Sequence, residues 1–270
     1  METKYREHAE EIVENLKKVD LVITIGGDGT FNEAVSGNLK RKEQLVLSHI
    51  PAGTTNDLGA VFCLGHNVVQ NLNDILDGAI CDIDICTINN KPFVYVGGLG
   101  KFMNIPYETT RNEKRKFGYV AYIFNGIKDF FNGKTNLYEL TYEIDNQKYN
   151  DICSIILISN ANQIAGIKKF YKDVKINDNK FEVLLCSLKS KKEILGGLFA
   201  ITSMDVTKAQ GFKFFKTDNL KIYFRSCSKK IWCLDGEKYE SDEVEYEIKI
   251  DKKLKMLLPK KAIEKGNMIL

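Results

Sequence analysis

The sequence has few of the features that mark fibrous, disulfide-rich or membrane-spanning proteins. Its 270 residues include only four prolines, and no apolar run approaches the roughly 18 residues needed to cross a bilayer. The charged N-terminal segment lacks the apolar stretch of a signal peptide. Seven cysteines occur without a C-x-x-C pair, and the three histidines form no zinc signature with them. We therefore expect a cytoplasmic globular protein with reduced thiols, and the net charge of +3 does not suggest a nucleic-acid partner.

The first third of the chain alternates between helix and strand patterns. Residues 3–18 have apolar side chains at helical spacing, and the run Leu21–Ile25 is typical of a strand buried on both faces of a parallel sheet. A second strand is predicted at Leu45–Ile50, and a helix at Val68–Asp77. This order predicts βαβ units and a doubly wound α/β domain.

A glycine-rich loop follows each of the two predicted strands. The first reads G-G-D-G-T-F-N-E (Gly26–Glu33), and its T-x-x-E end fits a capping box that starts a helix. The second reads P-A-G-T-T-N-D (Pro51–Asp57). Glycine lets backbone amides approach a phosphate, whereas Asp28 would repel one unless it serves a cation or a hydroxyl. Two such loops at one sheet edge indicate Mg²⁺-dependent phosphoryl transfer.

The first loop fits neither standard nucleotide-binding motif. Asn32 stands where a dinucleotide-binding loop has its third glycine, and the chain contains no G-x-x-x-x-G-K-[ST]. Taken alone, the loop could be a tight turn.

Beyond residue 80 the pattern changes to short strands separated by turn dipeptides. Asn89-Asn90, Asp145-Asn146 and Asp235-Gly236 are all favoured hairpin turns. Only residues 118–131 and 193–202 read as helices in this part. The pattern predicts an antiparallel β-sandwich.

Five segments, in order, resemble the diacylglycerol kinase catalytic-domain family, which includes bacterial soluble diacylglycerol kinases, related lipid kinases, ceramide kinases and sphingosine kinases. They are GGDGTFNEAVSG, PAGTTNDLGA, KFGYVAYIFNGIK, ISNANQIAGIKKFYKDVKINDNKFEVLLC and CLDGE. The resemblance implies an α/β domain like those of NAD kinase and phosphofructokinase, followed by an antiparallel β-sandwich. It places the first domain at 1–84 plus 254–270 and the second, lipid-binding domain at 85–253.

The resemblance also assigns roles to individual residues. It implies that ATP phosphates and the Mg²⁺ network are held by Gly26, Gly27, Asp28, Gly29, Thr30, Asn32, Glu33, Gly53, Thr54, Asn56 and Asp57. Asp28 then shares in catalysis, Asp235 is the general base, and Glu237 supports the metal–water network. For Asp235-Gly236 the alternative is a plain hairpin turn. Asp178, with the carbonyls of Lys175 and Lys180, matches a structural Mg²⁺ site; N-D-N-K replaces the usual D-D-G-L, so a plain turn is the alternative.

The resemblance implies transfer of the γ-phosphate of ATP to diacylglycerol, giving phosphatidic acid at the inner face of the membrane, and it allows a homodimer. A basic lipid-facing surface would comprise Lys101, Arg111, Lys114, Arg115, Lys116, Lys168 and Lys169, with Gly97, Gly98 and Gly100 at the interdomain cleft. One departure is the missing N-P-x-S-G loop, since the chain contains no Asn-Pro. A long-chain-base kinase, another lipid kinase, an NAD kinase and a truncated, catalytically impaired homologue are the alternatives.

Overall fold

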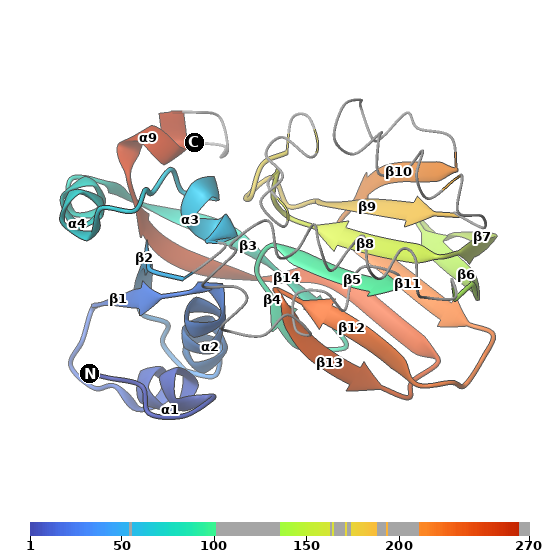
Figure 1. The fold of residues 1–270 in the computed structure, drawn as a ribbon, viewed down its shortest axis with the longest axis horizontal. Coiled ribbons are helices and arrows are strands. Elements are labelled where there is room, and N and C mark those ends of the chain that lie inside the picture. The colour runs from blue at the N-terminus through green and yellow to red at the C-terminus, as the bar shows by residue number, and fades with distance from the viewer. Residues whose placement is uncertain are drawn as a thin grey trace.

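Two β-sheets organise the molecule (Figure 1). The computed structural model describes residues 1–53, 56–100, 136–162, 164, 171, 174–187, 193 and 211–264. The predicted helices at 118–131 and 193–202 lie outside this part of the chain, apart from Glu193. No helix in the described ranges is long and apolar enough to span a membrane.

The N-terminal part alternates between helices and strands, as predicted. Its elements are α1 (His8–Asn15), β1 (Leu21–Gly26), α2 (Asp28–Leu39), β2 (Val46–Pro51), α3 (Asp57–Val61) and α4 (Val68–Leu76). Strands β1 and β2 are parallel, with Ile23 opposite Ser48. Helix α4 begins at Asn67, whose side chain accepts a hydrogen bond from the amide of Gln70.

The expectation that β1 is buried on both faces is wrong. Within the described residues β1 pairs only with β2, so it lies at an edge of the sheet. Thr24 is the one buried residue of the strand, and Ile25 is 60% exposed. A continuous apolar run indicates a strand, but it does not show that both faces of that strand are covered.

The capping-box prediction is also wrong. Helix α2 begins at Asp28, with Gly27 at its N-cap, rather than after Thr30. The carboxylate of Glu33 does not return to its own helix. It accepts hydrogen bonds from the amides of Glu7 (2.9 Å) and Ala9 (3.2 Å), so it fixes the start of α1 instead.

The rest of the described chain forms an antiparallel sandwich, which confirms the predicted fold class. Its strands are β3 (Ala79–Ile88), β4 (Lys91–Phe93), β5 (Val96–Gly100), β6 (Tyr138–Ile144), β7 (Gln147–Cys153), β8 (Ile155–Ser159), β9 (Phe181–Cys186), β10 (Phe212–Thr217), β11 (Asn219–Phe224), β12 (Lys230–Leu234), β13 (Glu237–Ser241) and β14 (Glu245–Leu258), with the short helix α9 (Lys260–Ala262) after them. One sheet has the order β1-β2-β14-β11-β6-β7, with β3 also on β14 and β4 on β3; the other has the order β10-β9-β8-β5-β12-β13. All three predicted turn dipeptides close hairpins, with positive φ at both residues of each.

Strands β3 and β14 run through both parts of the molecule. They pair along their length, with a register shift between Ile250 and Lys252. On β3, Ile85 belongs to the core beneath the helices, and Cys86 belongs to the core between the two sheets. The predicted domain boundaries at 84/85 and 253/254 stay a prediction. The hydrophobic cores change near these positions, but strands β3 and β14 continue across them.

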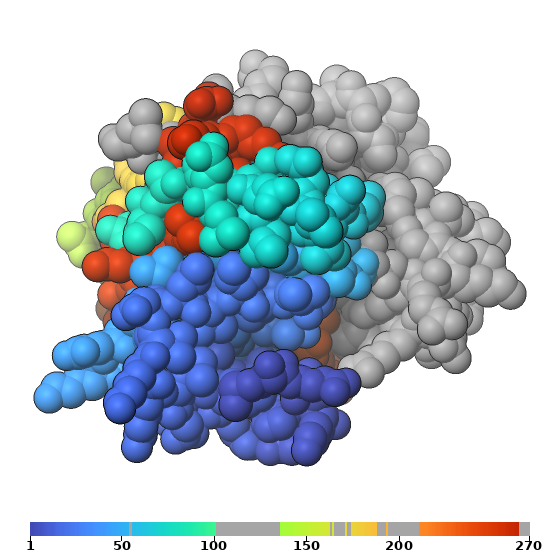
Figure 2. Space-filling model, turned by 90° about the vertical axis from the view of Figure 1, so that its left-hand side faces the viewer, coloured from blue at the N-terminus to red at the C-terminus, as the bar shows by residue number. Residues whose placement is uncertain are grey.

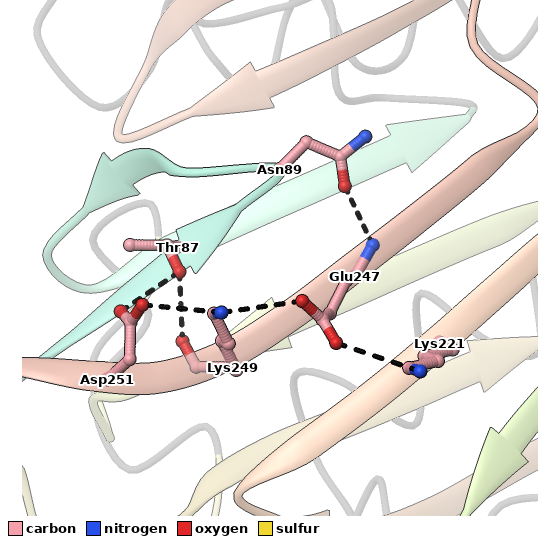
Figure 3. A network of polar contacts seen from close by, with 6 residues as sticks. All are labelled: Thr87, Asn89, Lys221, Glu247, Lys249 and Asp251. Atoms are coloured by element: carbon pink, nitrogen blue, oxygen red, sulfur yellow. Dashed lines mark hydrogen bonds and ion pairs between the residues drawn. The ribbon is translucent and has the colours of Figure 1, made fainter.

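A polar network surrounds the register shift (Figure 3). Thr87 of β3 donates to the carboxylate of Asp251 at 3.2 Å, and Lys249 lies 3.5 Å from the same carboxylate. Asn89 accepts a hydrogen bond from the amide of Glu247 at 2.8 Å. These contacts tie the end of β3 to β14 at the point where the two cores meet.

Helix α1 packs beside α2, and two lysines of α9 form ion pairs with aspartates of α4 and its C-cap. Figure 2 shows this end of the molecule, with the N-terminal segments in blue, the α4 region in teal above them and the C-terminal residues in red. Lys260 pairs with Asp77 at 3.2 Å, and Lys261 forms an ion pair with Asp74. The C-terminal end of the described chain therefore returns to the N-terminal part.

Candidate active site

The two glycine-rich loops lie against each other at the carboxyl ends of β1 and β2. The amide of Ala52 donates to the carbonyl of Gly26 at 2.7 Å, which ties one loop to the other. A Cβ on Gly53 would lie 2.6 Å from the Cα of Gly27, so a side chain there would push the loops apart. The second loop is closed by Asn56, whose side chain bonds both the amide (2.8 Å) and the carbonyl (2.9 Å) of Gly53.

The first loop leads directly into α2, a helix of 12 residues. The first amides of a helix have no acceptor within the helix, and the helix dipole favours an anion at that end. Gly27, Asp28 and Gly29 supply the backbone of this turn. The arrangement therefore suits a phosphate group, as the sequence predicts.

Asp28 links the first loop to the start of α3. Its carboxylate accepts hydrogen bonds from the amides of Asp57 (3.1 Å) and Leu58 (3.4 Å). Burial raises the pKa of Asp28 to about 7, and the charges of Asp57 and Asp235 act in the same direction. Three carboxylates from distant parts of the sequence thus lie within each other's electrostatic field.

Asp235 reaches this group from the turn between β12 and β13. The residue has φ 47°, so the hairpin alternative is correct for its backbone, while its side chain points inward. The carboxylate accepts hydrogen bonds from the amides of Val94 (2.6 Å), Tyr95 (3.0 Å) and Val96 (2.9 Å). Burial raises the pKa of Asp235 to about 6, and these bonds, with one from Asn32, partly oppose that rise.

Asn32 has an unsatisfied acceptor beside the carboxylates. Its side chain bonds Asp235, yet its buried Oδ1 has no hydrogen-bond partner in the described part of the chain. A buried oxygen without a donor is expected to meet a ligand, a water molecule or a cation. Together with the carboxylates of Asp28 and Asp57, this set of oxygens fits Mg²⁺, which prefers oxygen ligands.

The described residues include no group of three or more His, Cys, Asp or Glu side chains placed to enclose a metal ion. Mg²⁺ is commonly held by one or two carboxylates together with water and substrate phosphates. The arrangement of Asp28 and Asp57 is compatible with that type of site.

Other predicted residues lie around this centre in different ways. Glu237 follows Asp235 at the rim, and its Oε1 lies 3.5 Å from the position of a Cβ on Gly29. Thr30 packs against Gly26, where an added Cβ would lie 2.8 Å from the Thr30 hydroxyl. Glu33 points to α1, as described above. Thr54 and the seven basic residues proposed for a lipid-facing surface lie outside the described residues.

The turn predicted to hold a structural metal has one hydrogen bond within itself and another to β3. Asp178 accepts from the amide of Lys180 at 3.1 Å, and the amide of Asn179 donates to Asp84 at 2.6 Å. Burial raises the pKa of Asp84, and the negative charge of Asp178 adds to that rise. The metal role of Asp178, with the carbonyls of Lys175 and Lys180, stays a prediction.

Tyr95 is a residue of the site that sequence reasoning missed. It is 5% exposed, and burial together with Asp28, Asp57 and Asp235 raises the pKa of its hydroxyl well above the usual value. The sequence P-F-V-Y-V gives no sign of this position, because an aromatic residue in a strand is usually part of a core. Gly97 and Gly98 of β5 pair with β12 next to it. Gly100, at φ 110°, approaches Ser154 so closely that a Cβ would lie 2.1 Å from its carbonyl oxygen.

Comparisons with known proteins find relatives among the diacylglycerol kinases. Residues 1–88 match the family described as "Diacylglycerol kinase catalytic domain". A diacylglycerol kinase of Staphylococcus haemolyticus is 30% identical over 184 residues, which cover 68% of this chain and 55% of that protein. A diacylglycerol kinase of Staphylococcus aureus is 29% identical, with 68% of this chain and 58% of that protein covered. The matched stretch thus spans little more than half the length of these curated relatives.

Solved structures show the same fold. A crystal structure of a Bacillus anthracis protein superposes with a TM-score of 0.78 at 21% identity, covering 96% of this chain and 85% of that one. A diacylglycerol kinase structure from the same organism gives a TM-score of 0.74 at 18% identity, covering 96% and 84%. Because residues 1–88 match this family and relatives named diacylglycerol kinase are about 30% identical over 68% of the chain, the chain belongs to the diacylglycerol kinase catalytic-domain family.

Proposed function

We propose that the protein is a lipid kinase that transfers the γ-phosphate of ATP to the hydroxyl group of diacylglycerol, giving phosphatidic acid, with Mg²⁺ as the required ion. The observation that carries this proposal is that the carboxylates of Asp28, Asp57 and Asp235 lie near one another beside the two glycine-rich loops. A family of kinases implies a nucleotide donor, and relatives named diacylglycerol kinase support a lipid acceptor.

In this proposal the protein positions the reacting groups and stabilises charge. The amides of the first loop and the start of α2 hold the phosphates, and Asp28 and Asp57 hold the ion. Bound Mg²⁺ would neutralise charge that develops on the phosphate oxygens. The bond from the γ-phosphorus to ADP breaks, a bond to the lipid oxygen forms, and the proton of the hydroxyl passes to a carboxylate.

Asp235 is the proposed proton acceptor. A carboxylate offers about four acceptor positions. Donors already occupy them: the amides of Val94, Tyr95 and Val96, and the side chain of Asn32. The lipid hydroxyl therefore has to replace one donor, and the Asn32 amide is the side chain among them that can move away.

The direct test is transfer of labelled γ-phosphate to diacylglycerol in mixed micelles, with Mg²⁺ or with EDTA. We expect labelled phosphatidic acid only with Mg²⁺. A panel with a long-chain base and NAD in place of diacylglycerol distinguishes the alternative acceptors. Absence of product from every acceptor, with the protein folded by circular dichroism, would contradict the proposal and favour a truncated, catalytically impaired homologue.

The role of Asp235 needs a separate test, because its side chain also holds the backbone at residues 94–96. Asp235→Asn places an NH₂ group against backbone amides, so we expect loss of stability of about 1–3 kcal/mol as well as loss of turnover. Asn32→Ala is the comparison, since it leaves those three bonds in place. Full turnover by folded Asp235→Asn would rule out the proton-acceptor role.

A cytoplasmic location with transient contact at the inner face of the membrane, and a homodimer, remain parts of the proposal. Vesicle sedimentation with and without diacylglycerol tests the contact, and analytical ultracentrifugation tests the dimer.

A further inference from the structure

Arg6 lies at the rim of the candidate active site, beside a residue that is far from it in sequence. Its Nη2 is 3.0 Å from Oε2 of Glu237, 231 residues away. The other oxygen of Glu237 faces the first turn of α2, 3.5 Å from the position of a Cβ on Gly29. The guanidinium group is therefore near the turn that would receive phosphate.

The backbone on the C-terminal side of Arg6 is held in place by α2. Glu33 binds the amides of Glu7 and Ala9, and Glu7 has φ 67°, in the left-handed region that non-glycine residues seldom adopt. Helix α1 lies so close to α2 that a Cβ on Gly37 would be 2.3 Å from a carbonyl oxygen of α1. At the other end of α1, Arg41 donates hydrogen bonds to two carbonyls of the helix and to that of Leu16, which follows it. Arg6 lies just before a helix that is held at both ends, so the position of its backbone is fixed.

The Arg6–Glu237 pair does not explain this arrangement by itself. The two side chains are 71% and 56% exposed, and ion pairs of this kind contribute little to stability because water and salt screen them. Asp57 and Glu237 are acidic residues of the site, and their negative charges oppose the approach of a phosphate. A guanidinium group beside them would offset that repulsion.

We propose that Arg6 contacts the phosphate chain of the bound nucleotide, and that Glu237 holds the guanidinium near the site until the nucleotide arrives. The inference rests on the proposed function, since it deepens the role of the same site. A guanidinium group binds phosphate oxygens through two parallel hydrogen bonds, whereas lysine acts as a point charge. The exposed position of Arg6 allows the short movement from Glu237 to a phosphate.

The test measures binding of a non-hydrolysable ATP analogue and of adenosine by isothermal titration calorimetry in Mg²⁺. The variants are Arg6→Gln and Arg6→Lys. The matched control is Arg225→Gln, which removes an exposed arginine paired with Glu139 at 2.6 Å on the sandwich. We expect Arg6→Gln to weaken the ATP analogue about ten- to a hundredfold. Adenosine binding and the unfolding temperature should stay at the parent values, and Arg6→Lys should recover part of the affinity.

Three results would overturn the inference. Equal affinity of Arg6→Gln and Arg225→Gln for the ATP analogue would show that Arg6 does not touch phosphate. Loss of adenosine binding or of thermal stability in Arg6→Gln would assign Arg6 a structural role. No binding of the ATP analogue by the parent would remove the proposed function itself, and that outcome is distinct because it precedes any comparison of variants.

Discussion

Asp28 shows how much of the site depends on single side chains. Its carboxylate binds two amides of another loop and shares an electrostatic field with Asp57 and Asp235. The sequence identifies these three acids because each lies in a recognisable motif. It does not reveal Tyr95, which lies between β4 and β5 and whose amide donates to Asp235. It also does not reveal that Oδ1 of Asn32 has no hydrogen-bond partner in the described part of the chain.

The raised pKa of Asp28 has a consequence for stability that can be measured. Its pKa is about 7 in the folded protein and 3.8 when unperturbed, so folding favours the protonated acid. This group therefore lowers the free energy of unfolding as pH rises from about 4 to 7. Asn does not ionise, so the stability of Asp28→Asn relative to the parent should increase over that range by on the order of 3 kcal/mol. Urea denaturation at pH 4.5 and pH 8 measures it.

The exposed Asp20 provides the control for that experiment. Asp20→Asn should leave the difference between the two pH values unchanged. Parallel pH curves for Asp28→Asn and the parent would show that Asp28 is not buried among acids.

At the scale of elements, α1 and α2 behave as one clamped pair. Glu33 holds the start of α1, Arg41 holds its end, and Lys40 pairs with Glu10 at 2.6 Å. Helix periodicity predicts α1, the T-x-x-E pattern predicts a helix after the first loop, and the turn dipeptides predict the hairpins. Which partner a polar side chain selects is decided by tertiary packing. For that reason the capping box pattern at Thr30 and Glu33 misled the sequence analysis.

Glu33→Ala should loosen the first turn of α1. The change removes two hydrogen bonds to backbone amides, and we expect a loss of about 1–3 kcal/mol together with faster hydrogen exchange at Glu7 and Ala9. Glu14→Ala is the control, because it removes an exposed helix glutamate that lies 3.7 Å from Lys40. If Glu33 belongs to the Mg²⁺ network instead, the variant will shift the Mg²⁺ dependence of turnover and leave exchange unchanged.

A buried ion pair in the sandwich gives a second prediction at this scale. Glu182 of β9 has a fully buried side chain 3.0 Å from Lys216 of β10, and burial raises its pKa to about 7. Lys216→Met leaves the glutamate without its partner, so stability at pH 8 should fall by about 3 kcal/mol. At pH 5 the glutamate is protonated and the loss should be smaller. Lys221→Met, from an exposed pair at 3.8 Å, is the matched control in urea denaturation.

At the scale of the whole molecule, one sheet serves two cores. Composition and alternation predict an α/β part followed by a β-sandwich, because each class has its own periodicity. Strand pairing lies beyond that reasoning: β14 contacts β2 at Met256 opposite Leu47 and also pairs with β3 and β11. No local sequence pattern in residues 245–258 predicts that this strand pairs with three others.

The shared strands predict how the protein unfolds. Since β3 and β14 contribute side chains to both cores, neither part can lose its structure without exposing strands of the other. We expect a single transition in scanning calorimetry, with equal calorimetric and van't Hoff enthalpies. Two separated transitions would show that the cores are independent.

The position of β14 also sets the order in which the protein can be completed during synthesis. Met256 lies against β2 and Leu254 against Ile83 of β3, so the last strand fills the middle of a sheet whose other members emerge first. Both glycine-rich loops lie before residue 58 in the chain, yet the sheet that supports them stays open until translation has passed residue 258. A nascent chain halted before that point would contain both loops, but the sheet beneath them would lack β14. The candidate active site is therefore complete only after β14 has been added.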